Sequence, residues 1–548
     1  MEKENMQPSM LSWNVANQGI FYFTMEIALE SDIPTYSGGL GVLAGDTLRA
    51  AADLGLPMVG ITLLWRNGYF KQSIDKEGWQ QEENAVWDYK TRLKKLDHYV
   101  RVKIEGRSVQ IDVWEYTIVG KTGHSVPVYM LDTNNPENAE KDRDINQYLY
   151  GGDEYMRLCQ EIVLGIGGVR ILRDLGFSNG DIYHLNEGHA SLLALELIRE
   201  RGYNSYDKIK KNCVFTTHTP VSAGHDEFHY DMLKKVLHPI YLEHLEGIIG
   251  QGSALNLTHL SHKLSRFVNG VSQMHGQVAR KMLDDPEIAA ITNGIHLPTW
   301  VHPAMKELYD QELKGWDIDP SFFVHAVKLK RDALWNAHQK AKQDLIDHVK
   351  KVNGAELSPE KLTLGFARRA ATYKRADLLF SDLDRLSNIG ADKLQFIYAG
   401  KAHPKDSPGK ELIHRVVDAG KKLGKQIPVV YLEGYNMDLG AMLTSGCDVW
   451  LNTPRRPREA SGTSGMKSAL NGVLNFSILD GWWIEGYVED QTGWAIGPPA
   501  DMTDMETYDD SEDVNDLYNK LENELIPTYY DNRDKWIDMM RTTIALNT

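Results

Sequence analysis

Cysteine is scarce in this sequence, which has 548 residues but only Cys159, Cys213 and Cys447. The three lie far apart and form no C-x-x-C pair, so neither a zinc site nor a disulfide framework is expected. No apolar run reaches the roughly 18–20 residues that a membrane span requires. The N-terminus MEKENMQPSM also lacks a basic segment followed by an apolar one. We therefore expect a cytoplasmic protein with reduced thiols and no membrane partner.

Positive charge is also in deficit. With 60 Lys and Arg against 76 Asp and Glu, the formal net charge is −16. An acidic chain is a poor candidate for binding nucleic acid, although a local basic pocket for phosphate is compatible with that balance. Hydrophobic residues make up 42% of the chain, as in ordinary globular proteins. A chain of this length is too long to fold around a single hydrophobic core, so two or more domains are expected.

Short apolar runs alternate with helical patterns along the chain, which favours an α/β fold with doubly wound parallel sheets. A helix is expected after the glycine-rich turn in 37–55, and another over 153–176, where apolar residues recur at helical spacing. The tail 516–546 is interpreted as helices broken at Pro527 that pack back onto the first half. Strands are expected at 19–29, 56–65, 181–185, 212–218, 361–369, 394–401, 429–435 and 448–454.

Two stretches place glycine or cations near the carboxyl end of an expected strand, where ligands bind in parallel sheets. EASGTSGMK (459–467) is typical of a glycine-rich turn that opens a helix and attracts an anion, with Lys467 close enough to touch that ligand or hold it covalently. The alternative is a plain capped helix with a surface lysine. FARRAATYKR (366–375) holds four cations, which indicate either a phosphate or carboxylate pocket or a solvated basic helix face.

Three further motifs are less specific. His189 in LNEGHA is either catalytic or a satisfied polar residue, and HTPVSAGHDEFH (218–229) holds three histidines. Its proline and glycine argue against a rigid helical metal site, so no metal is expected. GGLGVLAGD (38–46) matches a dinucleotide fingerprint only in part, and a phosphate- or sugar-facing loop is preferred. Four tryptophans are expected in the core or on the surface rather than along a sugar cleft: Trp13, Trp65, Trp87 and Trp114.

Ten segments together resemble the α-glucan phosphorylases, which act on glycogen, starch or maltodextrin, and within them the short bacterial and archaeal type. They follow the family order from about residue 21 to about residue 475. The pattern EASGT-x-x-MK with a downstream LNG is highly specific. The segments are YFTMEIAL, YSGGLGVLAGDTLRAAADLG, LNEGHA, FTTHTPVSAGHDEF, VNGVSQMHG, TNGIH, ARRAATYKR, YAGKAHP, YLEGY and EASGTSGMKSALNG.

The resemblance implies a GT-B architecture, in which two Rossmann-like doubly wound domains face each other across an active-site cleft. The expected N-terminal domain is 1–295, with the glucan side, the Gly-rich loop and His189, joined by the C-terminal helix at about 530–548. The expected C-terminal domain is 296–529 and binds phosphate and pyridoxal 5'-phosphate (PLP), which the resemblance places as a Schiff base on Lys467.

The same matches imply a role for individual residues. Catalysis is expected from Lys467, His189, Arg369 and Lys374. The cofactor site is expected from Lys467, Thr463, Ser464, Gly465, Arg368, Tyr435 and Gly39. The substrate phosphate is expected at Arg369, Lys374, Gly38 and Gly39, and the glucosyl unit at His189, Asn293, Glu459, Ser461 and Gly462.

The implied reaction is reversible, retaining phosphorolysis of the non-reducing-end glucose of an α-1,4-glucan to α-D-glucose 1-phosphate. The cofactor phosphate is expected to relay a proton to the substrate phosphate, and cations must separate these two anions. Arg368, Asn436 and Ala28 stand where long members commonly have lysine, arginine and an aromatic residue. The resemblance allows a homo-oligomer, although most of the N-terminal regulatory segment of the long enzymes has no counterpart here.

Two other functions remain as alternatives. One is a GT-B glucosyltransferase of the glycogen-synthase type that uses a sugar nucleotide, and the other is a non-catalytic glucan-binding homologue. Glycogen synthases carry two glutamates eight residues apart in the corresponding loop, whereas this chain has Glu459 and then Lys467. The lysine favours PLP over a sugar nucleotide.

Overall fold

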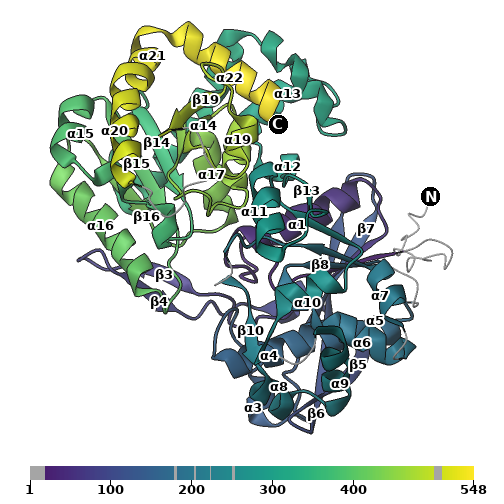
Figure 1. The fold of residues 1–548 in the computed structure, drawn as a ribbon. Coiled ribbons are helices and arrows are strands. Elements are labelled where there is room, and N and C mark those ends of the chain that lie inside the picture. Colours follow the sequence, from purple (N-terminus) through teal and green to yellow (C-terminus); the bar gives the residue numbers. More distant parts are fainter. Residues whose placement is uncertain (1–18, 178–181, 203–204, 222–223, 250–252, 499–508) are drawn as a thin grey trace, which may run out of the picture.

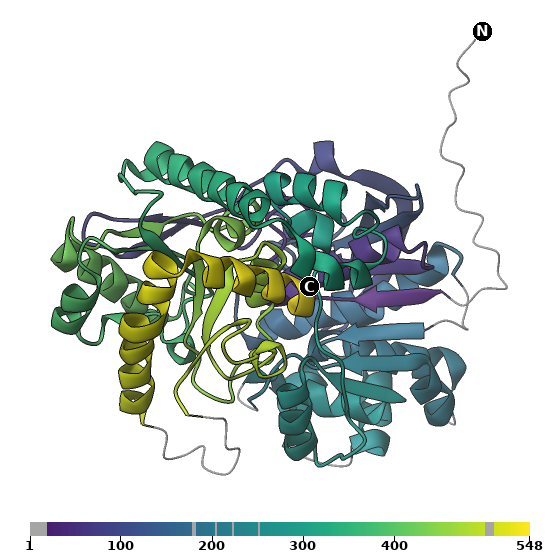
Figure 2. The same cartoon turned by 90° about the horizontal axis from the view of Figure 1, so that it is seen from above.

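The protein is described from a computed structural model that covers residues 19–177, 182–202, 205–221, 224–249, 253–498 and 509–548. Strands and helices alternate along the chain, so the structure is mixed α/β, as the sequence predicts (Figure 1). Viewed from above, the first half (purple to blue) and the second half (green to yellow) lie side by side (Figure 2). Within the described ranges no helix is both long and apolar enough to cross a membrane.

The first sheet has nine strands in the order β13-β12-β9-β8-β1-β2-β7-β6-β5. Strands β13 to β7 run parallel, and β7, β6 and β5 form an antiparallel meander at one edge. The strands are β1 (Ile20–Phe23), β2 (Met58–Leu63), β5 (Lys94–Ile104), β6 (Arg107–Val119), β7 (Ser125–Asp132), β8 (Ile182–Asn186), β9 (Cys213–Thr216), β12 (Phe267–Gly270) and β13 (Ala289–Ala290). The principal helices of this half are α1 (Gly39–Asp53), α4 (Glu154–Ile162), α5 (Gly168–Asp174), α6 (Leu192–Arg201), α7 (Tyr206–Asn212), α8 (Tyr230–Val236), α9 (Pro239–Ile249), α10 (Leu257–Lys263) and α11 (Gln273–Leu283).

The second sheet has six parallel strands in the order β16-β15-β14-β17-β18-β19. β14 and β15 are buried at every residue, as expected for parallel strands covered by helices on both faces. The strands are β14 (Leu362–Ala367), β15 (Leu394–Ala399), β16 (Val429–Leu432), β17 (Val449–Asn452), β18 (Leu474–Ile478) and β19 (Gly493–Ile496). The principal helices are α12 (Leu297–Trp300), α13 (Pro303–Glu312), α14 (Arg331–Asn353), α15 (Leu383–Gly390), α16 (Ser407–Leu423), α17 (Met437–Gly446) and α18 (Thr463–Leu470).

A hairpin of the first half reaches across to the second half. It consists of β3 (Lys71–Ile74) and β4 (Gln80–Glu83), which extend under the second sheet in Figure 1. The side-chain amides of Gln72 and Gln80 donate to the carbonyls of Gly400 and Ala402 at 2.7 and 2.9 Å. These bonds hold the two halves together beside the loop that follows β15.

The C-terminal segment differs from the sequence prediction in two respects. Helical structure continues through Pro527, because a π-helical turn (Leu521–Leu525) directly before it accommodates a residue that cannot donate an N–H. The break comes instead at Asn532, before α22 (Arg533–Asn547). α22 contacts the 3-10 helix η5 (Pro320–Lys328), α14 and α18, and its apolar residues belong to the core of the second half. The expectation that this helix joins the first half is corrected accordingly.

Candidate active site

A cavity of about 1480 Å³ lies between segments that follow strands of the two sheets. All but one of the residues expected at the site contribute to its wall. They are Gly38, Gly39, His189, Asn293, Arg368, Arg369, Lys374, Tyr435, Glu459, Ser461, Gly462, Thr463, Ser464 and Lys467. Gly465 lies behind them, since a Cβ at that position would meet Asn475 Oδ1 at 2.6 Å. Its lack of a side chain lets α18 pack against the sheet.

The turn before α18 exposes the N-terminus of that helix to the cavity. Gly462 has φ +96°, in the left-handed region that favours glycine, and no side chain caps the helix. Thr463 and Ser464 follow at the cavity wall, where the first N–H groups of the helix have no intrahelical partner. The arrangement is suited to an anion.

Lys467 is buried one turn further along α18, which excludes the surface-lysine interpretation. Its Nζ lies 3.6 Å from the centre of the Trp300 ring. Burial lowers the pKa of Lys467 to about 8, with Arg368 and Arg49 acting in the same direction and Asp46 opposing them. The neutral amine is therefore far more abundant near neutral pH than it is for an ordinary lysine, which favours a nucleophilic role.

Asp46 and Trp300 are parts of this site that the sequence reasoning missed. Asp46 comes from α1 in the first half, and its Oδ2 accepts a 2.7 Å hydrogen bond from the indole Nε1 of Trp300. Both side chains are buried. Trp300 comes four residues after the end of TNGIH (292–296), but nothing in the local pattern indicates that its ring faces Lys467.

The buried carboxylate of Glu459 lies between two cations. Its Oε1 lies 2.7 Å from Nη2 of Arg368, and its Oε2 pairs with Nζ of Lys374. Burial alone raises the pKa of Glu459, but the two cations outweigh it and hold the pKa at about 2. Lys374 is buried too, so the 366–375 stretch is a cation pocket rather than a solvated helix face.

A second carboxylate, which the sequence did not reveal, lies behind Glu459. Asp480 accepts backbone hydrogen bonds from the N–H groups of Glu459 (2.9 Å) and Gly481 (2.8 Å). Burial, together with the negative charge of Glu459, raises the pKa of Asp480 to about 7. Asp480 thus fixes the backbone from which Glu459 projects.

The opposite wall begins at α1 and carries the glycine pair. A Cβ at Gly38 or Gly39 would meet no atom within 4 Å, so both face open space. The carboxylate of Glu26 accepts from the N–H of Gly38 at 3.1 Å. Arg369, from the loop after β14 of the second sheet, also lines the cavity and presents a guanidinium to it.

The remaining predicted residues lie at the end of the cavity formed by the first sheet. Nε2 of His189 is 3.3 Å from Asp226, and burial lowers the pKa of His189 to about 4, so the ring is neutral. His218 lines the same region, and its N–H donates to Glu187 at 2.7 Å. Ser461 is buried with an Oγ that has no protein partner, which suits a ligand hydroxyl.

Positions that depart from the family pattern have visible roles. Asn436 caps α17, where its Oδ1 accepts from Leu439 N at 2.9 Å. Ala28 is fully buried against the core of the second half. Ser464, expected at the cofactor site, accepts at its Oγ from Trp450 Nε1 at 3.1 Å.

The four tryptophans named above lie in different surroundings. Trp65 and Trp114 are buried, Trp87 is half-buried and lines the cavity, and Trp13 lies outside the described residues.

Within the described ranges, no group of three or more His, Cys, Asp or Glu side chains is arranged to hold a metal ion.

Comparison with known proteins gives consistent matches. A family model described as Carbohydrate phosphorylase matches residues 21–142 and 241–520. Maltodextrin phosphorylase of Thermococcus litoralis is 40% identical, over 96% of this chain and 68% of that relative. Glycogen phosphorylase of Mycobacterium tuberculosis is 36% identical, over 96% and 68% of the two chains. Glycogen phosphorylase of Aquifex aeolicus is 35% identical, over 96% and 83%.

Proposed function

The chain belongs to the carbohydrate phosphorylase family, and from this premise we propose that it is a PLP-dependent α-1,4-glucan phosphorylase. Its reaction is reversible, retaining transfer of the non-reducing-end glucose to inorganic phosphate. The observation that carries the proposal is the cavity in which a buried lysine of lowered pKa lies beside a cluster of arginine and lysine cations.

The residues present fit PLP. The amine of Lys467 can react with an aldehyde, and the open N-terminus of α18 beside Arg368 suits a phosphate group. Tyr435 lines the cavity near the same cation. When bound, PLP would supply a phosphate able to exchange a proton with the substrate phosphate.

The substrate phosphate is assigned to Arg369, Lys374 and the backbone of Gly38 and Gly39. Lys374 is already held by Glu459, so an incoming anion competes with a carboxylate for the same cation. Once displaced, Glu459 can accept hydrogen bonds from sugar hydroxyls, together with Ser461 and Asn293 at the cavity wall. The cations also lower the electrostatic cost of placing two phosphate groups close together.

We also propose the two-domain GT-B division, with Rossmann-like domains at 1–295 and 296–529 facing across the cavity. Support comes from the sheets, because β13 ends at Ala290 and the six strands of the second sheet begin at Leu362. A cytoplasmic location is supported by Cys159, Cys213 and Cys447, which are unpaired buried thiols. Formation of a homo-oligomer stays a prediction, which the mass measured by analytical ultracentrifugation would test.

The test is release of glucose 1-phosphate from a defined malto-oligosaccharide with inorganic phosphate, using protein purified with PLP. Wild type should release the α-anomer, and Lys467→Ala and Arg369→Gln should each lose at least about 100-fold in kcat/KM. Arg415→Gln is the matched control, since the half-exposed side chain of that arginine pairs with Asp377 on the outer face of α16 and does not line the cavity. Turnover of ADP- or UDP-glucose without phosphorolysis would establish the sugar-nucleotide alternative, and glucan binding without either activity would establish the binding-protein alternative.

A further inference from the structure

Arg375 directly follows the phosphate-site residue Lys374 and has an unusual backbone. Its φ is +46°, a left-handed conformation that is uncommon for a residue with a side chain. Its side chain is only 5% exposed and points away from the cavity wall that Lys374 lines. A strained, buried arginine beside a substrate-binding lysine requires surrounding contacts that hold it.

Those contacts join two loops that are far apart in sequence. Arg375 Nε and Nη2 donate to the carbonyls of Thr453 and Pro454, each at 2.9 Å. In return, the hydroxyl of Thr453 donates to the carbonyls of Lys374 and Arg375, each at 3.0 Å. The loop after β14 and the loop that leads from β17 to Glu459 are therefore bound to each other at Arg375.

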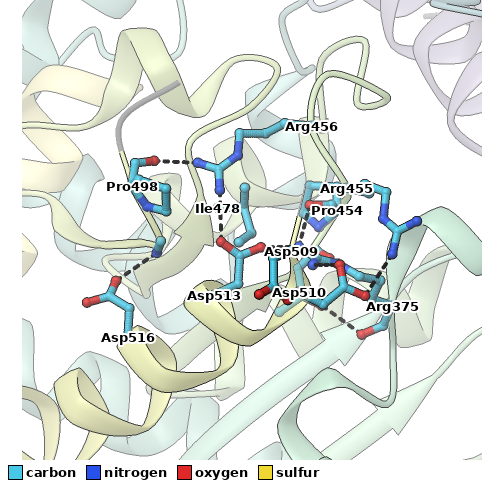
Figure 3. Close-up of polar contacts among 12 residues, drawn as sticks. Arg375, Pro454, Arg455, Arg456, Ile478, Pro498, Asp509, Asp510, Asp513 and Asp516 are labelled. Atoms are coloured by element: carbon cyan, nitrogen blue, oxygen red, sulfur yellow. Dashed lines mark hydrogen bonds and ion pairs between the residues drawn. The ribbon is translucent and has the colours of Figure 1, made fainter. Parts of the chain in front are cut away.

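Two aspartates of α20 (Asp510–Lys520) complete the network, as Figure 3 shows. Asp513 is fully buried and bridges Arg375 Nη2 (2.7 Å) and Arg456 Nη2 (2.8 Å). Asp510 bridges Arg375 Nη1 (2.8 Å) and Arg455 Nη2 (2.7 Å). Each carboxylate thus links one arginine of the first loop to one arginine of the second.

We propose that Arg375, Asp510 and Asp513 form a positioning network that sets Lys374 against Glu459 and thereby tunes the affinity for substrate phosphate. The inference rests on the proposed function and extends it to residues outside the cavity. Lys374 and Glu459 are 85 residues apart in the sequence, so their contact requires the two loops to stay in a fixed position relative to each other. A misplacement of about 1 Å in such a site can cost up to 100-fold in rate or affinity.

Asp513→Asn removes the charge that both arginines share while keeping one acceptor oxygen. We expect the phosphate KM of this variant, and its phosphate Kd by calorimetry, to rise about tenfold. The glucan KM should rise less than the phosphate KM, because His189 and Asn293, which are assigned to the sugar together with Glu459, come from segments outside the network. Asp510→Asn should have a smaller effect in the same direction and keeps the test decisive if Asp513→Asn does not fold, since the Asp510 side chain is 40% exposed.

Asp448→Asn is the matched control. Asp448 is also fully buried and paired with a cation, Lys342, at 2.6 Å, but this pair lies away from the cavity. It should lower thermal stability while leaving the phosphate KM and Kd within about twofold of wild type.

An unchanged phosphate KM and Kd in the Asp510 and Asp513 variants would overturn the proposal, as would equal rises in the Asp448 control. Wild type reports separately on the proposed function. If wild type binds phosphate without phosphorolysis, the proposed function fails. The ratio of each variant's phosphate Kd to that of wild type then tests the positioning network alone. If wild type neither binds phosphate nor turns over, both fail.

Discussion

Replacing Glu459 by Gln tests the competition between this carboxylate and phosphate for the buried cations. The pKa of Glu459 is lowered from 4.5 to about 2, because Arg368 and Lys374 outweigh its burial. A lowered folded-state pKa stabilises the protein above pH 4.5, and that stability is lost as the pH falls through about 2. At pH 7 it is fully present, and a difference of this size corresponds to about 3 kcal/mol.

Glu459→Gln should therefore lower the free energy of unfolding at pH 7 by about 3 kcal/mol in phosphate-free buffer, since it leaves buried Lys374 and the largely buried Arg368 without their carboxylate. Added inorganic phosphate should restore more stability to the variant than to wild type, because it no longer competes with Glu459. The assay is a thermal or urea melt with and without phosphate, at matched ionic strength.

Glu485→Gln provides the control for this experiment. Glu485 is exposed and accepts hydrogen bonds from Gln273 N and Thr292 Oγ1, and within the described residues it forms no ion pair. Glu485→Gln should show neither the loss of unfolding free energy nor the greater stabilisation by phosphate. If phosphate stabilises wild type and Glu459→Gln equally, then Glu459 does not compete with phosphate and the reasoning is refuted.

Three further predictions follow from buried charges. Asp46→Asn should lower the pKa of Lys467 below about 8, because the charge of Asp46 raises that pKa. The pH profile of amine labelling in PLP-free protein measures the pKa, and an unchanged midpoint would contradict the prediction. Asp480 has its pKa raised to about 7, so its ionisation costs stability as the pH rises from 3.8 through 7. Asp480→Asn should consequently gain melting temperature relative to wild type between pH 5 and pH 8, and parallel pH curves would disprove this. Lys342→Met removes the lysine from buried Asp448, which keeps His338 and the N–H of Thr363 as partners, and should cost about 3 kcal/mol in urea unfolding, whereas a loss below about 1 kcal/mol would contradict it.

Much of the fold could be predicted from local patterns. The runs that became β14, β15 and β17 are continuous and apolar, and each is followed by cavity-lining residues, as in parallel sheets. The turn at Gly462 was also predictable, because glycine and a helix-opening run occur together.

Features that depend on distant pairing could not be predicted. The β3–β4 hairpin bonds to Gly400 and Ala402 through more than 300 residues of separation, which no local period encodes. Arg375 and Asp513 are likewise 138 residues apart, and Asp46 meets Trp300 across 254. The break at Asn532 has no such signal, because Pro527 predicts an earlier stop, whereas the π turn before Pro527 lets the helix continue past it.

The most direct test of the cleft assignment is borohydride reduction of protein prepared with PLP, followed by peptide mass mapping. A phosphopyridoxyl adduct on Lys467 is the predicted result, and it would fix the cofactor in the cavity between the two sheets. An unmodified Lys467 under the same conditions would contradict the assignment of this lysine and of the residues placed around it.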